Sequence, residues 1–127
     1  MSDVVVTVPK NFTHPDCPGL KGLAAWVGEG DAAGAEWSGQ EWEFFLGGSK
    51  PVIGSGERVY VVCEGKLRGY APLIRVEDYG YGSWALIRGG GAIAVTVDEP
   101  ITGFRGFRYR WWDRSAERPF PDWQKST

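Results

Sequence analysis

The chain has little of several residue types on which common kinds of site are built. It carries two cysteines, Cys17 and Cys63, and a single histidine, His14, in 127 residues. Two cysteines are too few for a disulfide framework, and zinc needs three or four ligands, so we expect neither a disulfide scaffold nor a metal site. A Ser-His-Asp triad would have to use His14, which lies in a loop beside a proline. These shortages argue against metal chemistry and common nucleophilic catalysis, and we expect no cofactor.

Long apolar runs are also missing. No stretch approaches the ~20 residues that a membrane-spanning helix needs. The beginning of the chain, MSDVVVTVPK, does not have the basic and then apolar pattern of a signal peptide. We therefore expect a cytoplasmic protein that does not contact membranes. The length of 127 residues indicates one domain spanning residues 1–127.

Positive charge is scarce overall but is concentrated near the end of the sequence. The net charge is −2. Residues 1–50 carry 3 basic and 7 acidic side chains, residues 51–100 carry 5 and 6, and residues 101–127 carry 6 and 3. A positive region placed in this way suits a small local contact better than a long track along a duplex.

Local patterns predict a strand-rich fold. The high numbers of glycine (19) and proline (8) favour turns and strands over a helical bundle. A short helix is expected near residues 19–28, and Glu64-Gly65 is expected to close a tight hairpin. Strands are predicted at 3–9, 41–46, 57–63, 66–78, 83–88 and 92–97 and in the arginine-rich segment that ends at Trp112. The fold class is therefore mainly β (α+β), a small barrel or strongly curled sheet with one or two short helices.

Two of these strands carry more specific expectations. The first, Asp3 to Pro9 with its run of β-branched residues, is expected to be buried on both faces. In the strand at 57–63, Cys63 shares a face with Val59 and Val61, so it is expected to face the core and to be inert.

The stretch GFRGFRYRWWDR, residues 103–114, combines four arginines with five aromatic residues. In an extended chain Arg108 and Arg110 share a face and point together toward solvent or a ligand. Three interpretations are open. The arginines could be solvated, or paired with Asp113 and Glu117, on a half-buried strand. They could contact phosphates beside aromatic stacking surfaces, as in single-stranded nucleic acid binding. The segment could instead form a protein-interaction surface, for which Arg and Trp are also suited.

The segment GERVYVVCEGKLRGYAPLIRV, residues 56–76, resembles the central hairpin of PUA-like domains, the group that includes the ASCH and EVE families. The resemblance rests on Gly56-Glu57 at the strand start, the Glu64-Gly65 turn, and Gly69-Tyr70 in the second strand. The predicted order of elements is similar over most of the chain. The resemblance implies a PUA-like β pseudo-barrel that associates with RNA or DNA.

EVE-like members are similar to readers that hold a flipped, modified base in an aromatic pocket. Carried onto this sequence, that resemblance suggests Lys10 and Asn11 after the first strand, Trp26 at the helix end and Trp37 in the next loop. A flipped base needs a ring to stack on and polar groups along its Watson–Crick edge.

ASCH-like members imply a different outcome, a hydrolase acting on RNA or an acylated nucleoside. Their basic motif matches Gly19-Leu20-Lys21, but no arginine follows Lys21 before the expected helix end. If this chemistry exists, Lys21 would be the base or nucleophile, and Glu57 or Glu64 would be the partner carboxylate.

The favoured hypothesis is a module that binds nucleic acid, single-stranded or modified, or a nucleoside. Phosphates would be held by Arg68, Arg108 and Arg110, and the base pocket would be bordered by Tyr70, Trp112 and the early tryptophans. The hypothesis requires the late arginines and the early indoles to border one hollow. A hydrolase and a protein-interaction module remain the alternatives.

Overall fold

The computed structural model describes residues 3–8, 41–89 and 92–119. Within these residues the fold is mainly β, as predicted. The elements are β1 (Val4–Thr7), β2 (Trp42–Gly47), β3 (Arg58–Cys63), β4 (Lys66–Gly80), β5 (Ser83–Arg88), β6 (Val95–Thr96), β7 (Phe107–Tyr109), the 3-10 turn η1 (Arg114–Ala116) and β8 (Arg118–Pro119). The helix expected at 19–28 lies outside the described residues.

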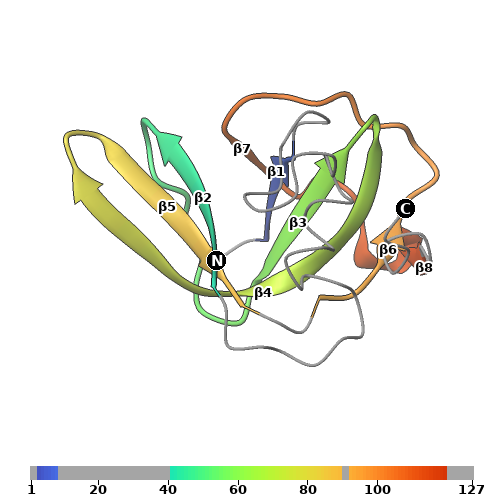
Figure 1. The fold of residues 1–127 in the computed structure, drawn as a ribbon. Helices are drawn as coiled ribbons and strands as arrows, with labels where there is room; N and C mark the ends of the chain where they lie inside the picture. The colour runs from blue at the N-terminus through green and yellow to red at the C-terminus, as the bar shows by residue number, and fades with distance from the viewer. Residues whose placement is uncertain (1–2, 9–40, 90–91, 120–127) are drawn as a thin grey trace, which may run out of the picture.

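Six strands form one sheet in the order β2-β5-β4-β3-β1-β7, which curls into a half-barrel (Figure 1). The long strand β4 belongs to both halves of this curl. Its residues 66–72 pair with β3, and its residues 73–80 pair with β5. The prediction of a strongly curled sheet is thereby confirmed at the level of a barrel-like β fold.

The two long hairpins turn in the same way. Glu64-Gly65 joins β3 to β4 with φ angles of 51° and 78°, and Tyr81-Gly82 joins β4 to β5 with φ angles of 56° and 75°. Positive φ at both central residues is the requirement of a type I′ turn, whose twist matches that of the strands. The predicted hairpin at Glu64-Gly65 is confirmed.

Pairing of β1 explains why the first strand is short and deeply buried. It runs parallel to β3, with Val5 opposite Tyr60, and antiparallel to β7, with Val5 opposite Arg108. The side chains of Val4, Val5 and Val6 are almost completely buried, so the expectation of burial on both faces is confirmed.

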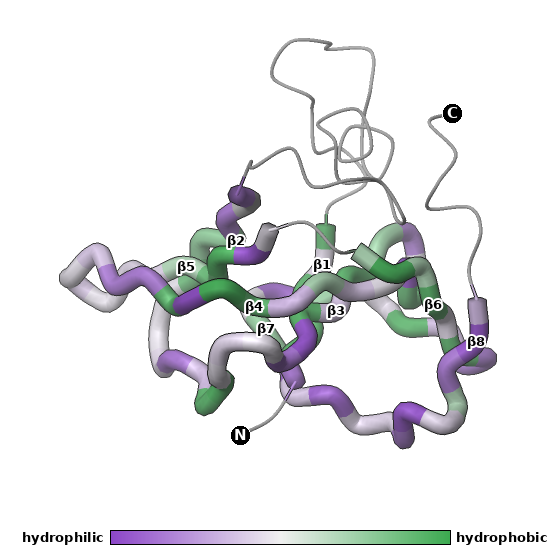
Figure 2. The backbone as a smooth tube through the Cα atoms, turned by 90° about the horizontal axis from the view of Figure 1, so that it is seen from below, coloured by the Kyte–Doolittle hydropathy of each residue, from purple (hydrophilic) through white to green (hydrophobic). Residues whose placement is uncertain are grey.

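Side-chain alternation along β1 and β3 divides the core into two clusters. One contains Cys63 with Val59 and Val61 and confirms that Cys63 faces the core. The other contains Tyr60 and Trp112 and lies under the chain that follows β5. Figure 2 shows hydrophobic chain in β1 and β3 at the centre of the molecule and hydrophilic chain along much of its outside.

Two predicted strands are shorter than expected. In the segment 92–97, Ile93 exchanges two backbone hydrogen bonds with Tyr70, at 3.0 and 2.8 Å, before the chain leaves β4. Only Val95–Thr96 then forms β6, because it pairs with the two-residue β8. In the arginine-rich segment β7 is limited to three residues because it pairs only with Val4, Val5 and Val6.

Among the described residues no helix is long and apolar enough to cross a membrane.

Candidate functional site

A pocket of about 370 Å³ opens between the two ends of the curled sheet. We call it the edge pocket, because β2 and β7 are the first and last strands of the sheet order. Its walls come from β2, from the end of β1 and from the segment that leads into β7. The lining residues are Val6, Thr7, Val8, Glu43, Phe44, Phe45, Leu46, Phe104, Arg105 and Gly106.

The lining consists of runs of consecutive residues. Neighbouring residues of a strand point to opposite faces, so a pocket lined by residues 43–46 follows the backbone edge of β2. The other edge of β2 pairs with β5, and no strand in the described part of the chain pairs with the edge that faces the pocket. The edge pocket is therefore lined by the backbone of β2 as well as by side chains.

Aromatic rings and arginines meet at the wall that precedes β7. The guanidinium of Arg108 lies over the ring of Phe104, 4.5 Å from its centroid, and Arg105 is exposed beside it. The backbone N–H of Phe104 donates to Thr7 Oγ1 at 3.2 Å, which fixes this segment on the end of β1. A Cβ at Gly103 would lie 3.1 Å from Thr7 Cγ2, so glycine permits this close approach. Phe104 and Arg105 thus lie in the pocket lining, and Arg108 contacts this wall through the ring of Phe104.

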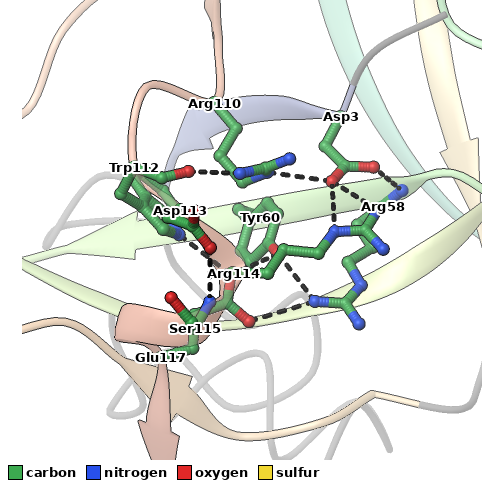
Figure 3. Close-up of polar contacts among 9 residues, drawn as sticks. All are labelled: Asp3, Arg58, Tyr60, Arg110, Trp112, Asp113, Arg114, Ser115 and Glu117. Carbon is green, nitrogen blue, oxygen red and sulfur yellow. Dashed lines mark hydrogen bonds and ion pairs between the residues drawn. The ribbon is translucent and has the colours of Figure 1, made fainter.

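A second polar cluster, at the other end of β1, is internal. The carboxylate of Asp3 is almost fully buried and accepts hydrogen bonds from the backbone N–H of Arg58 at 2.9 Å, Arg110 Nε at 3.0 Å and Arg114 Nη2 at 2.7 Å (Figure 3). Burial alone would raise the pKa of Asp3. The hydrogen bonds from Arg58, Arg114 and Arg110 outweigh burial, and the pKa lies below its usual value.

Glu117 organises the other half of this cluster. Its carboxylate accepts from the Tyr60 hydroxyl at 2.5 Å, from Arg58 Nη1 at 3.0 Å and from Trp112 Nε1 at 2.9 Å (Figure 3). Burial, followed by the hydrogen bond to Glu117, raises the pKa of the Tyr60 hydroxyl, which therefore stays neutral. Because each buried polar group has partners of opposite charge or hydrogen-bonding type, the cluster acts as a clamp between β1, β3 and the segment 110–118.

This clamp corrects part of the prediction for the late arginines. Arg108 is exposed as expected, but Arg110 forms an ion pair with Asp3 and donates to the carbonyl of Trp112. The expectation that Arg108 and Arg110 point together toward solvent or a ligand is wrong for Arg110, because the buried carboxylate of Asp3 draws its guanidinium inward. The alternative pairing with Asp113 and Glu117 also differs from the structure: Glu117 pairs with Arg58, and Asp113 caps η1.

Trp112 packs inside the molecule. It is 7% exposed and meets the ring of Tyr60 edge-on, with 5.1 Å between centroids. Its neighbour in the sequence, Trp111, is 45% exposed. The indole predicted to border a base is therefore a core residue, because its N–H finds a buried partner in Glu117.

The two predicted residues of β4 do not line the edge pocket. Arg68 Nε donates to the carbonyl of Cys63 at 2.8 Å, across the turn of the hairpin. Tyr70 packs on Tyr60, with 5.1 Å between ring centroids. The guanidinium of Arg58 lies over the ring of Tyr70, with Cζ 4.1 Å from the ring centroid. Their proposed contacts with phosphate and base are not tested by these interactions.

The remaining predicted residues separate into two groups. Lys10, Asn11, Lys21, Trp26 and Trp37 lie outside the described residues. Glu57 and Glu64 flank β3 at its two ends, ~20 Å apart at the rise of an extended strand. At most one of these two carboxylates could act with Lys21. Glu57 also accepts a hydrogen bond from the backbone N–H of Gly54 at 3.1 Å.

Phe44, Phe45, Phe104 and Arg105 were not selected from the sequence as site residues. The signal for the last two was present, because they belong to the same arginine-aromatic stretch as Arg108. Nothing in the sequence placed β2 opposite that stretch, since this follows from the order of strands in the sheet. Among the described residues, no group of three or more His, Cys, Asp or Glu side chains could hold a metal ion.

Comparison of the chain with protein families, with characterised proteins and with solved structures finds no match. The functional argument therefore depends on the geometry of the edge pocket.

Proposed function

We propose that this protein binds single-stranded nucleic acid or a modified nucleobase, with a base in the edge pocket and phosphates at Arg105 and Arg108. The observation that carries the proposal is a concave pocket lined by phenylalanine rings and the exposed Arg105, with the exposed guanidinium of Arg108 over the ring of Phe104. Stacking surfaces beside a cationic wall are the combination that single-stranded nucleic acid requires. The half-barrel and its long central hairpin are also consistent with the PUA-like fold that the sequence resembles.

The pocket has a size and polarity that suit a base. Its volume of about 370 Å³ falls in the usual range for small-molecule sites. Phe44 and Leu46 supply apolar surface on the β2 side of the pocket, against which a base can lie.

The positions of the charged side chains favour one orientation of a bound nucleotide. Arg105 in the lining and Arg108 over the ring of Phe104 attract phosphate to the wall that precedes β7, whereas the β2 side presents the apolar side chains of Phe44 and Leu46. A bound nucleotide would therefore place its base toward β2 and its backbone along the segment that enters β7.

The test is a binding measurement by fluorescence anisotropy with short single-stranded DNA and RNA, followed by modified nucleosides as competitors. The variant Arg105→Glu with Arg108→Glu should lose at least about tenfold in affinity at low salt, because two phosphate contacts become repulsions. The matched control is Lys66→Glu with Arg118→Glu, two exposed cations outside the pocket lining, which should bind nearly as the natural sequence does. Equal losses in the two variants would contradict the assignment, as would no binding of any oligonucleotide or nucleoside.

A protein-interaction module is the second candidate, and the half-exposed rings of Tyr109 and Trp111 favour it, because aromatic residues are enriched at protein interfaces. Under this alternative a protein partner stays bound after nuclease treatment, and the Arg105→Glu, Arg108→Glu variant retains it.

A further inference from the structure

The end of the half-barrel formed by β2, β5 and β4 presents three large aromatic side chains to solvent. Phe45 is 66% exposed, Tyr79 is 48% exposed and Tyr81 is fully exposed at 109%. The rings of Phe45 and Tyr79 lie 5.8 Å apart, so they form one continuous surface. We call these three residues the hairpin surface. The β4–β5 hairpin that carries two of them extends away from the rest of the sheet (Figures 1 and 2).

Tyr81 contributes unfavourably to the stability of the fold. It occupies the first central position of the turn with φ 56°, in the left-handed region. This backbone conformation costs about 1 kcal/mol for most residues other than glycine, and Asn or Gly is the usual choice. Full exposure means that burial of the ring does not offset this cost. A strained and exposed aromatic residue at the tip of a hairpin indicates a contact with another molecule.

The second aromatic residue is held in place. The Tyr79 hydroxyl donates to Glu43 Oε2 at 2.5 Å, and its ring lies against Phe45. At the base of the turn, the backbone N–H of Gly80 donates to Asp78 Oδ1 at 2.8 Å. The surface is therefore organised before any partner binds, which reduces the entropy lost on binding.

The surroundings of the hairpin surface carry an excess of negative charge. Arg75 is held by Glu41 and Glu77, and Lys50 is held by Asp78. Glu43 adds a further carboxylate, and its contact is the neutral hydroxyl of Tyr79. The surroundings thus contain four carboxylates and two cations, which gives a net charge of −2. Nucleic acid is disfavoured at such a surface, and a cationic partner is favoured.

We propose that the hairpin surface docks a basic segment of a partner protein. A lysine or arginine side chain of that segment lies over the rings of Phe45 and Tyr79 and beside the carboxylate of Glu43, where cation–π attraction and charge attraction act together. Tyr81 contacts apolar side chains that flank the cation. This surface shares Glu43 and Phe45 with the lining of the edge pocket, but its other carboxylates and the rings of Tyr79 and Tyr81 lie outside that lining, so it goes beyond the proposed binding of nucleic acid.

The experiment is an NMR titration of the full chain with a short blocked peptide of alternating arginine and leucine. Amide resonances of Phe45, Tyr79 and Tyr81 should shift, and the same peptide with citrulline in place of arginine should bind much more weakly. Tyr81→Gly should weaken peptide binding about twofold to fivefold while leaving the fold as stable as before or more stable. Tyr79→Leu should weaken it by a similar factor.

Several outcomes would overturn the proposal. These are equal binding of the citrulline peptide, shifts confined to other parts of the chain, no shifts at all, or shifts of Tyr79 and Tyr81 caused by an oligonucleotide. Self-association of the chain that disappears in Tyr81→Gly would assign the surface to a second copy and also overturn it. The two proposals fail independently: Tyr81→Gly should leave oligonucleotide affinity unchanged, and Arg105→Glu with Arg108→Glu should leave peptide affinity unchanged.

Discussion

The carboxylate of Asp3 accepts a hydrogen bond at 3.0 Å from Nε of Arg110, a residue 107 positions later in the chain. The two residues are joined a second time, because the backbone N–H of Arg110 donates to the carbonyl of Asp3 at 3.1 Å. Asp3 immediately precedes β1, and Arg110 immediately follows β7. This contact makes Arg110 part of the structure that holds β7 against β1, whereas Arg105 and Arg108 are exposed.

The variant Asp3→Asn should lower the free energy of unfolding by about 3 kcal/mol, because it leaves the guanidiniums of Arg110 and Arg114 without their buried partner charge. Urea denaturation followed by tryptophan fluorescence measures this. Asp98→Asn is the matched control: it breaks an exposed ion pair with Arg118 and should cost less than about 1 kcal/mol. A loss at Asp3 no larger than that at Asp98 would contradict the role of the clamp.

The clamp also predicts the dependence of stability on acid. The pKa of Asp3 is lower in the folded state than its ordinary value of 3.8, so the ionised form stabilises the native state. This contribution is fully present above the ordinary pKa and is lost as the pH falls through the folded pKa. The difference in unfolding free energy between the natural sequence and Asp3→Asn should therefore shrink as the pH falls below about 4. A difference that is constant from neutral pH into strong acid would be inconsistent with this mechanism.

The tight turn of the β3–β4 hairpin offers a stabilising substitution. Glu64 adopts φ 51°, a left-handed conformation that suits asparagine better than glutamate. Glu64→Asn should raise the unfolding free energy by about 0.5 to 1 kcal/mol, measured as a higher melting temperature in calorimetry. Glu99→Asn, at an exposed position without positive φ, controls for the change of residue type and should have little effect.

Nucleic-acid affinity should show a defined dependence on salt. For single strands, each phosphate contact contributes about 0.7 to the slope of log affinity against log salt concentration. Arg105→Ala and Arg108→Ala should each reduce this slope by about that amount, and Lys66→Ala should leave it unchanged. A slope that stays the same in both arginine variants would show that these residues do not contact phosphate.

Local signals were sufficient to predict most strands. The β-branched run of β1 and the Glu64-Gly65 turn could be recognised because their causes lie within a few residues. Pairings between distant segments could not be predicted in the same way. Nothing near Val5 indicates that it lies between Tyr60 and Arg108, because many strand orders satisfy the same local patterns.

The candidate site was predicted in part for the same reason. Charge and ring clustering in residues 103–114 pointed to a segment that supplies part of the edge-pocket lining, and Arg108 lies over the ring of Phe104 in that lining. Alternation placed Arg110 on the face that points to solvent or a ligand, and Trp112 was expected to border a base, but the carboxylates of Asp3 and Glu117 draw the two side chains inward. The positions of those acids depend on tertiary pairing, which alternation does not contain.

Strand β4 supplies one continuous backbone to both sides of the half-barrel, and its register shifts between Leu73 and Arg75, where it passes from β3 to β5. The curvature of β4 therefore sets the distance between β2 and β1, because these strands lie on its two sides in the sheet order. Substitutions that stiffen or relax residues 72–75 would change the size of ligand that fits while every residue touching that ligand stayed the same. The size of the edge pocket could then change through substitutions in the bend of β4, without any substitution in the pocket lining.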